Sequence, residues 1–189
     1  PGGTAHIGQK FTIANDQGEV VHPKTGENIG RMIDILGTLE ITRTGDKLYE
    51  AKIIYSNKEI LKGAKILNYV EPTQAVVLKK TDAHINGIIL LSWEDKELIG
   101  TRDIVMIDKG LSDGLEAGNV LYVFREGREI HDPASEVPLQ TPMRKLGTLV
   151  VIETQEYTST AMVTMSKRVI YKGDMVKSCS DCYIETAEK

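Results

Sequence analysis

Two cysteines, Cys179 and Cys182, are the residues of this chain whose spacing most directly suggests chemistry. They form Cys-Ser-Asp-Cys near the C-terminus. A structural zinc site takes four ligands, usually two such pairs or one pair with histidines, and a thioredoxin-like motif opens a helix after a strand. This pair stands alone in a polar tail. We therefore interpret it as two free or mutually bridged cysteines, with a metal or redox role as the alternative.

Three other side chains are candidate contacts for a ligand or a partner. Trp93, the single tryptophan, stands in the polar stretch Ser-Trp-Glu-Asp-Lys. Its ring could stack on a sugar or a partner, and the alternative is that it caps the edge of a core. Tyr122 and Arg125 follow a glycine turn, where the preferred interpretation is barrel filling plus one solvated charge. The sequence contains no nucleophile elbow, phosphate-binding glycine loop or paired-histidine helix. We expect no catalytic residue, no cofactor and no metal.

An internal repeat is the strongest pattern in the chain. Shifted by about 110 residues, the sequence aligns with itself without a gap. The matched positions include Gly8 with Gly118, Pro23 with Pro133, Gly37 with Gly147, and Gly63 with Gly173. A duplicated unit keeps what its fold needs, and here the matches are glycines, prolines and alternating aliphatics. No acid–base or metal-ligand set is matched. The repeat therefore predicts architecture and does not predict a reaction.

Apolar and polar residues alternate with a period of two, which is typical of β-strands. Gly37 and Gly147 fall in the middle of matching strands, where a bulge bends a sheet towards a barrel. Gly8, Gly63, Gly118 and Gly173 each precede a strand by a few residues, where a tight turn needs a positive φ. Pro23 and Pro133 mark turns. We predict an all-β protein with two tandem, duplicated small β-barrel-like domains.

The repeat also sets the expected domain boundaries. Residues 1–75 form the first β-domain, an N-terminally truncated copy; 83–178 form the second; 179–189 are a C-terminal tail. Two strands, 87–92 and 104–107, precede the second copy, and their counterparts would lie before Pro1. The first copy therefore lacks strands and exposes an edge. The apolar run 74–79 is the internal candidate to cover it, and a strand from a second chain, giving a homodimer, is the alternative.

Composition narrows the classes of protein further. The net charge is −4, with acidic and basic residues mixed along the chain. Nucleic-acid binders usually carry a basic stripe, so we expect no nucleic-acid partner. No apolar run approaches the ~18–20 residues of a membrane span, so we expect no membrane-spanning segment. The chain begins Pro-Gly-Gly, and we interpret it as a fragment of a longer protein.

Residues 103–125, Asp-Ile-Val-Met-Ile-Asp-Lys-Gly-Leu-Ser-Asp-Gly-Leu-Glu-Ala-Gly-Asn-Val-Leu-Tyr-Val-Phe-Arg, carry a resemblance. They resemble the region downstream of the LysM module in bacterial LysM peptidoglycan-binding domain-containing proteins. The first copy is similar to that region through residues 22–27, 36–39 and 60–63. A more distant similarity is to the C-terminal domain of flagellar assembly protein T, another periplasmic β-domain. The resemblance covers most of 8–177, but the LysM module itself has no counterpart here.

The resemblance implies a location in the periplasm or cell envelope. It implies contact with peptidoglycan through a LysM module outside this chain, with envelope proteins as further partners. The expected function is a non-catalytic envelope module pair acting as spacer, scaffold or protein-interaction surface. The alternative is a cell-wall-acting hydrolase with a site between the two domains. Polar residues unique to one copy would mark that site, and the candidates are Arg125, His131 and Asp132.

Overall fold

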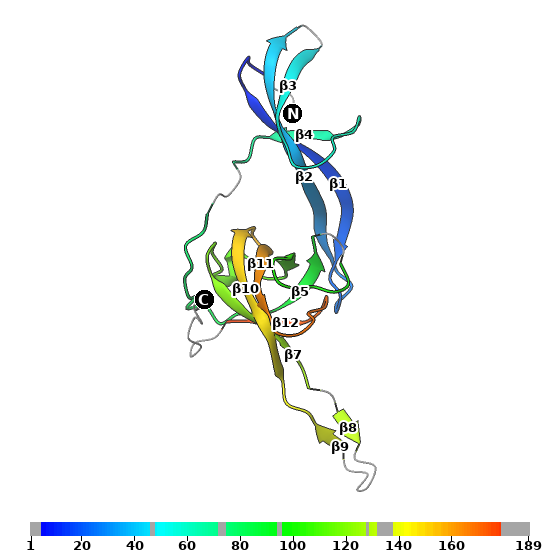
Figure 1. The fold of residues 1–189 in the computed structure, drawn as a ribbon, viewed down its shortest axis with the longest axis vertical. Helices are drawn as coiled ribbons and strands as arrows, with labels where there is room; N and C mark the ends of the chain where they lie inside the picture. The colour runs from blue at the N-terminus through cyan, green and yellow to red at the C-terminus, as the bar shows by residue number, and fades with distance from the viewer. Residues whose placement is uncertain are drawn as a thin grey trace. The chain divides into compact units, whose positions relative to one another are not determined.

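The structure is a computed structural model that describes residues 5–45, 48–71, 75–93, 96–127, 129–131 and 138–178. Over these residues it contains twelve strands and one 3-10 turn (η1, Leu111–Asp113) (Figure 1). The predicted all-β class is confirmed. The chain divides into two compact units, one with Pro1–Val21 and Glu27–Pro72, the other with His22–Gly26 and Thr73–Lys189. Pro133, Cys179 and Cys182 lie outside the described residues.

The first unit is a four-stranded antiparallel sheet. Its strands are β1 (Lys10–Val21), β2 (Asn28–Thr44), β3 (Tyr49–Ser56) and β4 (Lys65–Asn68), in the order β3-β2-β1-β4. The two longest strands, β1 and β2, form a hairpin whose connecting residues include Pro23 in a turn and Gly26 at φ +76°. Phe11, Ile13 and Ile41 are buried on the sheet. The sheet does not close on itself, which leaves β3 and β4 at its edges.

The second unit is a closed barrel with the strand order β10-β11-β6-β5-β12-β7. Its strands are β5 (Asn86–Ser92), β6 (Ile104–Ile107), β7 (Val120–Arg125), β10 (Arg144–Thr154), β11 (Ser159–Ser166) and β12 (Met175–Lys177). A two-stranded ribbon, β8 (Glu129–His131) with β9 (Pro138–Gln140), extends between β7 and β10 along the chain. By the repeat, this ribbon corresponds to residues 19–21 and 28–30, the paired ends of β1 and β2 beside the turn at Pro23.

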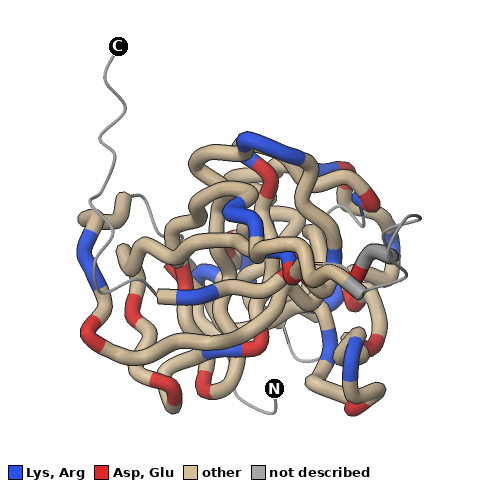
Figure 2. Tube along the Cα trace, turned by 90° about the horizontal axis from the view of Figure 1, so that it is seen from below, with Lys and Arg blue, Asp and Glu red and all other residues tan. Residues whose placement is uncertain are grey.

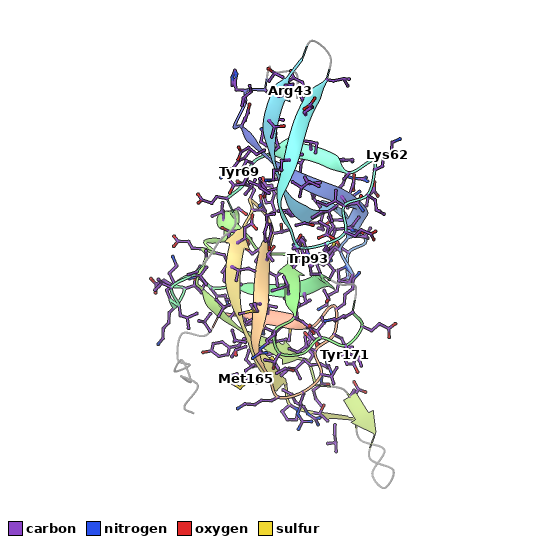
Figure 3. All side chains as sticks on the ribbon, turned by 45° about the horizontal axis from the view of Figure 1, so that its top comes forward. Arg43, Lys62, Tyr69, Trp93, Met165 and Tyr171 are labelled. Carbon is purple, nitrogen blue, oxygen red and sulfur yellow. The ribbon has the colours of Figure 1, made fainter. Side chains whose placement is uncertain are left out.

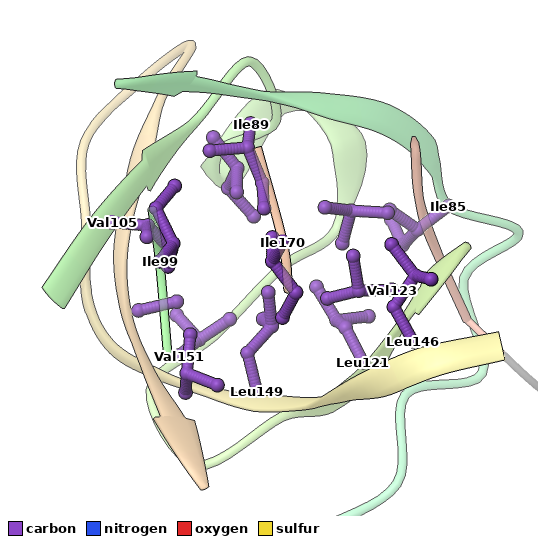
Figure 4. Close-up of a cluster of buried hydrophobic side chains, with 14 of the residues drawn as sticks. Ile85, Ile89, Ile99, Val105, Leu121, Val123, Leu146, Leu149, Val151 and Ile170 are labelled. Atoms are coloured by element: carbon purple, nitrogen blue, oxygen red, sulfur yellow. The ribbon is translucent and has the colours of Figure 1, made fainter. Parts of the chain in front are cut away.

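Aliphatic side chains fill the barrel. Figure 4 shows Ile89, Val105, Leu121, Leu149 and Ile170 directed into its interior, and all five side chains are fully buried. The first four come from β5, β6, β7 and β10, whose alternate residues point inwards, and Ile170 comes from the segment between β11 and β12. Closure therefore removes both the apolar face and the strand edges from water.

The two units share one strand register. Ile13 pairs with Gly37 on β1 and β2, and 110 residues later Val123 pairs with Gly147 on β7 and β10. A bulge follows each of these pairs on the same side. The pairing of β2 with β3 matches that of β10 with β11 throughout, and β1 with β4 matches β7 with β12 over three pairs. The sequence repeat is thus a repeat of backbone hydrogen bonding.

Close approach of a neighbouring strand explains the two mid-strand glycines. A Cβ on Gly37 would overlap the carbonyl oxygen of Tyr55, and a Cβ on Gly147 would overlap that of Met165. Both lie at the bulges where β2 and β10 bend. The turn glycines have a different reason, since their backbone is left-handed: φ is +83° at Gly8, +102° at Gly63, +95° at Gly118 and +87° at Gly173.

The expectation that residues 74–79 cover the edge of the first sheet is wrong. Of this run the structure describes Ala75–Lys79, and these residues belong to the second unit. Lys79 pairs in parallel with Asn119: its N–H donates to the Gly118 carbonyl at 2.9 Å, and the Val120 N–H donates back to the Lys79 carbonyl at 3.0 Å. Gly118, which lacks a Cβ, lets the Val77 carbonyl approach it. The side chain of Val77 itself is exposed.

Candidate functional site

The open sheet of the first unit is the candidate functional surface. In the barrel, β11 pairs with β6 and β12 pairs with β5. The matching strands of the first unit, β3 and β4, have one partner strand each among the described residues. The first unit therefore contains four of the six strands of the barrel, and the two that are missing are adjacent.

Exposure shows what the two missing strands leave uncovered. Val163 of β11 is fully buried, whereas its counterpart Ile53 of β3 is 50% exposed. Val176 of β12 is also fully buried, and its counterpart Ile66 of β4 is 40% exposed. Because the registers match, these side chains face the same side of the sheet in both units. The difference in burial therefore comes from the absence of covering strands. In the first unit, these aliphatic residues are therefore only partly buried.

Ion pairs fix the strands of the open sheet to one another. Asp16 on β1 accepts hydrogen bonds from Arg31 Nε at 3.0 Å and Lys65 Nζ at 2.8 Å, which connects it to β2 and β4. Arg31 first, then Lys65 and the Gly18 N–H, hold the pKa of Asp16 well below its usual value. Arg43, labelled in Figure 3, donates to Glu50 of β3 at 3.0 Å. The edges β3 and β4 are thus positioned by polar contacts, while their apolar residues stay uncovered.

The structure places the residues singled out in the sequence on the barrel. Trp93 directly follows β5, is half-buried, and donates its backbone N–H to the Ile104 carbonyl at 2.8 Å (Figure 3). Tyr122 on β7 is only 4% exposed, and the Lys145 ammonium lies 4.1 Å from its ring centroid. The ring of Tyr122 is therefore closed to a ligand. These two side chains and Arg125 belong to the barrel unit, and the open sheet belongs to the other unit.

Arg125 serves the barrel as the partner of a buried carboxylate. Its Nε and Nη2 donate to the two oxygens of Asp174 at 2.7 and 2.6 Å, and Nη2 also donates to the Val169 carbonyl at 3.0 Å. The guanidinium lies 4.7 Å from the ring centroid of Tyr171. Asp174 is 7% exposed and is the first cause of a raised pKa at Arg125. This bidentate pair neutralises a charge that burial would otherwise penalise.

A cavity of about 360 Å³ lies beside this ion pair. Arg125, Arg144 and Arg168 contribute to its lining together with Glu126 and Tyr171. Guanidinium groups bind carboxylate or phosphate groups, but that of Arg125 is already hydrogen-bonded to Asp174. Elsewhere the charges are mixed: Figure 2 shows basic and acidic residues interspersed along the trace, in keeping with the net charge of −4.

The described residues contain neither a metal-binding cluster nor a membrane-spanning helix. There, no three histidine, cysteine, aspartate or glutamate side chains gather closely enough to hold a metal ion. None of the helical structure within those ranges has the length and apolar character needed to cross a membrane. Every buried side-chain nitrogen or oxygen described has a hydrogen-bond partner.

Comparison with known proteins adds no family assignment. No protein-family model matches the chain, and no curated protein matches it.

The signal for the open sheet was present in the repeat. Ile53 and Ile66 could have been identified by reading their counterparts Val163 and Val176 as barrel interior. The sequence analysis predicted an exposed edge in the first copy but did not identify these two side chains.

Proposed function

We propose that this chain is a non-catalytic protein-interaction module of the bacterial cell envelope. One observation carries the proposal: the strand register that closes into a barrel in the second unit is left open in the first. The barrel unit buries its aliphatics within itself. The first unit keeps the same aliphatics but exposes them, and an exposed apolar face beside unpaired strand edges is typical of a surface that binds another polypeptide.

The resemblance to LysM peptidoglycan-binding proteins supports the envelope setting of this proposal. In it, a LysM module outside this chain contacts peptidoglycan, and the two β-units act in the periplasm as scaffold and interaction surface for other envelope proteins. The hydrolase alternative is less well supported. Its best-placed candidate in the sequence, Arg125, is committed to neutralising Asp174.

Photo-crosslinking tests the interaction surface directly. A photo-activatable residue at Ile53, in cells that make the protein, should give a discrete adduct with another polypeptide. Ile54 is the matched control: it has the same side chain one residue further on, and its counterpart Thr164 is exposed on the outside of the barrel. We expect no adduct from Ile54. Equal adducts from both positions, or none from Ile53, would contradict the proposal.

Sedimentation with cell-wall sacculi tests where the glycan is bound. We expect this chain to remain in the supernatant and to release no muropeptides. Strong co-sedimentation that is lost on Trp93→Ala would instead place a sugar site on the barrel, and release of muropeptides would support the hydrolase.

A further inference from the structure

We propose that the barrel unit binds a small monocarboxylate with an apolar body, and that Arg144 and Arg168 bind its carboxylate in the cavity of about 360 Å³. All residues that line this cavity belong to the barrel unit. The cavity is therefore a second site, distinct from the interaction surface proposed for the first unit.

The loop that carries Arg168 has a structural counterpart in the first unit. The Ser166 hydroxyl donates a hydrogen bond to the Arg168 carbonyl at 2.6 Å. In the first unit, the Ser56 hydroxyl donates in the same way to the Lys58 carbonyl at 2.5 Å. Arg168 and Lys58, which are 110 residues apart, therefore occupy equivalent places in two copies of one loop.

Arg144 also has a structural counterpart, which is Asp34. Arg144 of β10 pairs with Arg125 of β7 across the two strands. Asp34 of β2 pairs with Asn15 of β1, again 110 residues earlier on both strands. The side chains at positions 34 and 144 therefore start from equivalent backbone sites.

The two units fill these matched positions with different charges. In the first unit, Lys58 Nζ donates to the carboxylate of the buried Asp34 at 2.7 Å. In the barrel, arginines occupy both places, as Arg144 and Arg168. Neither guanidinium makes a hydrogen bond or ion pair with another residue in the described ranges. The barrel thus lacks the carboxylate that the first unit supplies from its own chain.

The charges around the cavity match a ligand with a single negative charge. Like charges directly opposite each other on neighbouring strands are destabilising, as Arg125 and Arg144 are. Asp174 neutralises Arg125, and Glu126 also lines the cavity. Three arginines and these two carboxylates leave one positive charge. A ligand carboxylate balances that charge, whereas a phosphate monoester carries about −1.5 to −2 near pH 7.

The rest of the lining favours a ligand with an apolar body. Leu146, Val169 and Tyr171 line the cavity beside the arginines. Arg125 holds this wall in place, because its Nη2 donates to the Val169 carbonyl at 3.0 Å and its guanidinium lies 4.7 Å from the centroid of the Tyr171 ring. A wall that is already ordered adds little entropic cost to binding. A hydrocarbon group next to the carboxylate would contact it.

Benzoate is the probe, with benzamide and inorganic phosphate as comparisons. Each is titrated into the full chain while NMR follows the amide signals of residues 125–127, 144–146 and 168–171. Benzoate should bind at least tenfold more tightly than benzamide, which has the ring without the charge. It should exceed phosphate, which has charge without a ring, by a similar factor. Benzoate that binds no more tightly than either of them would overturn the inference.

Arg144→Asp places in the barrel the acid that the first unit has at Asp34. The new carboxylate should pair with Arg168 and abolish benzoate binding, because it takes the place of the ligand's own carboxylate. Arg102→Asp is the matched control, at an exposed arginine of the barrel unit that does not line the cavity. It should bind benzoate as the parent chain does. Equal loss of binding in both variants would contradict a site at Arg144.

Two milder substitutions test the same site without introducing a new charge. Arg168→Gln should weaken benzoate binding at least fivefold and leave the urea unfolding midpoint unchanged, since its guanidinium has no partner among the described residues. Glu126→Gln removes a negative charge from the lining and should tighten binding at least twofold. Benzoate affinity that is insensitive to Arg168→Gln, or lowered by Glu126→Gln, would refute the assignment.

Discussion

Truncating two matched side chains, one in each unit, should destabilise the protein more where fewer carbon atoms are removed. Val163→Ala removes two carbons, and Ile53→Ala, at the matching position, removes three. Val163 is fully buried, so its lost burial amounts to ~1.6 kcal/mol at about 0.8 kcal/mol per carbon, and the cavity left behind raises the total to about 2–3 kcal/mol. Ile53 is 50% exposed, and water fills the space it leaves. Its cost should be about 1 kcal/mol, although its truncation is the larger one.

Urea unfolding and hydrogen exchange together measure both effects. The single tryptophan, Trp93, lies in the barrel unit, so its fluorescence follows that unit alone. With a urea dependence of about 1.5 kcal/mol per molar, Val163→Ala should lower the midpoint by ~1.3–2 M. Ile53→Ala should leave this midpoint unchanged and reduce exchange protection in β2 and β3 only slightly. An equal loss of protection in the two units would refute the reasoning, because it would mean that Ile53 is covered.

Three further changes test contacts in the two units. Gly147→Ala should destabilise the barrel by about 1–3 kcal/mol, because its Cβ would overlap a strand carbonyl; Gly100→Ala, whose Cβ would lie 3.9 Å from its nearest neighbour, should cost less than about 0.5 kcal/mol. Because its cationic partners lower the pKa of Asp16 in the folded sheet, the resulting stability is complete above the ordinary carboxyl pKa and is lost as the pH falls through the lower folded value. Exchange protection of β4 should therefore decline as the pH falls below about 4 in the parent chain but stay flat in Asp16→Asn. Arg125→Met should lower barrel stability by ~3 kcal/mol, since it leaves the carboxylate of Asp174 buried and unpaired, and adding Asp174→Asn should restore a large part of that loss in the same fluorescence assay.

The sequence repeat predicted two matching β-units with equivalent bends, but it named no strand pairs. Matched glycines at 37 and 147 marked equivalent bulges, and alternating aliphatics marked the strands on either side. This worked because a duplicated unit preserves the positions where backbone geometry permits no alternative, such as a glycine pressed against a neighbouring carbonyl. Such constraints are local and survive wherever the unit occurs.

The repeat could not predict which distant segments pair with each other. The apolar run ending at Lys79 was assigned to the edge of the first sheet, yet it pairs with Asn119 in the second unit. The apolar pattern of a segment does not tell which strand edge it pairs with. Here the pairing depends on Gly118, whose missing Cβ lets the segment approach. The candidate surface shows the same limit. Alternation assigns Ile53 to one face of its strand but carries no information on whether anything lies over that face.

Barrel closure also dictates when the second unit can fold. Its first strand, β5, pairs with its last, β12, and the paired residues Asn86 and Lys177 are about ninety positions apart in the chain. During synthesis, β5 leaves the ribosome long before β12 exists, so the seam of the barrel forms only when translation has passed residue 177. The hairpin of β1 and β2 pairs residues close in sequence and needs no such delay. In a nascent chain the incomplete first unit thus acquires its lasting structure before the complete one, which spends translation as an open and aggregation-prone sheet.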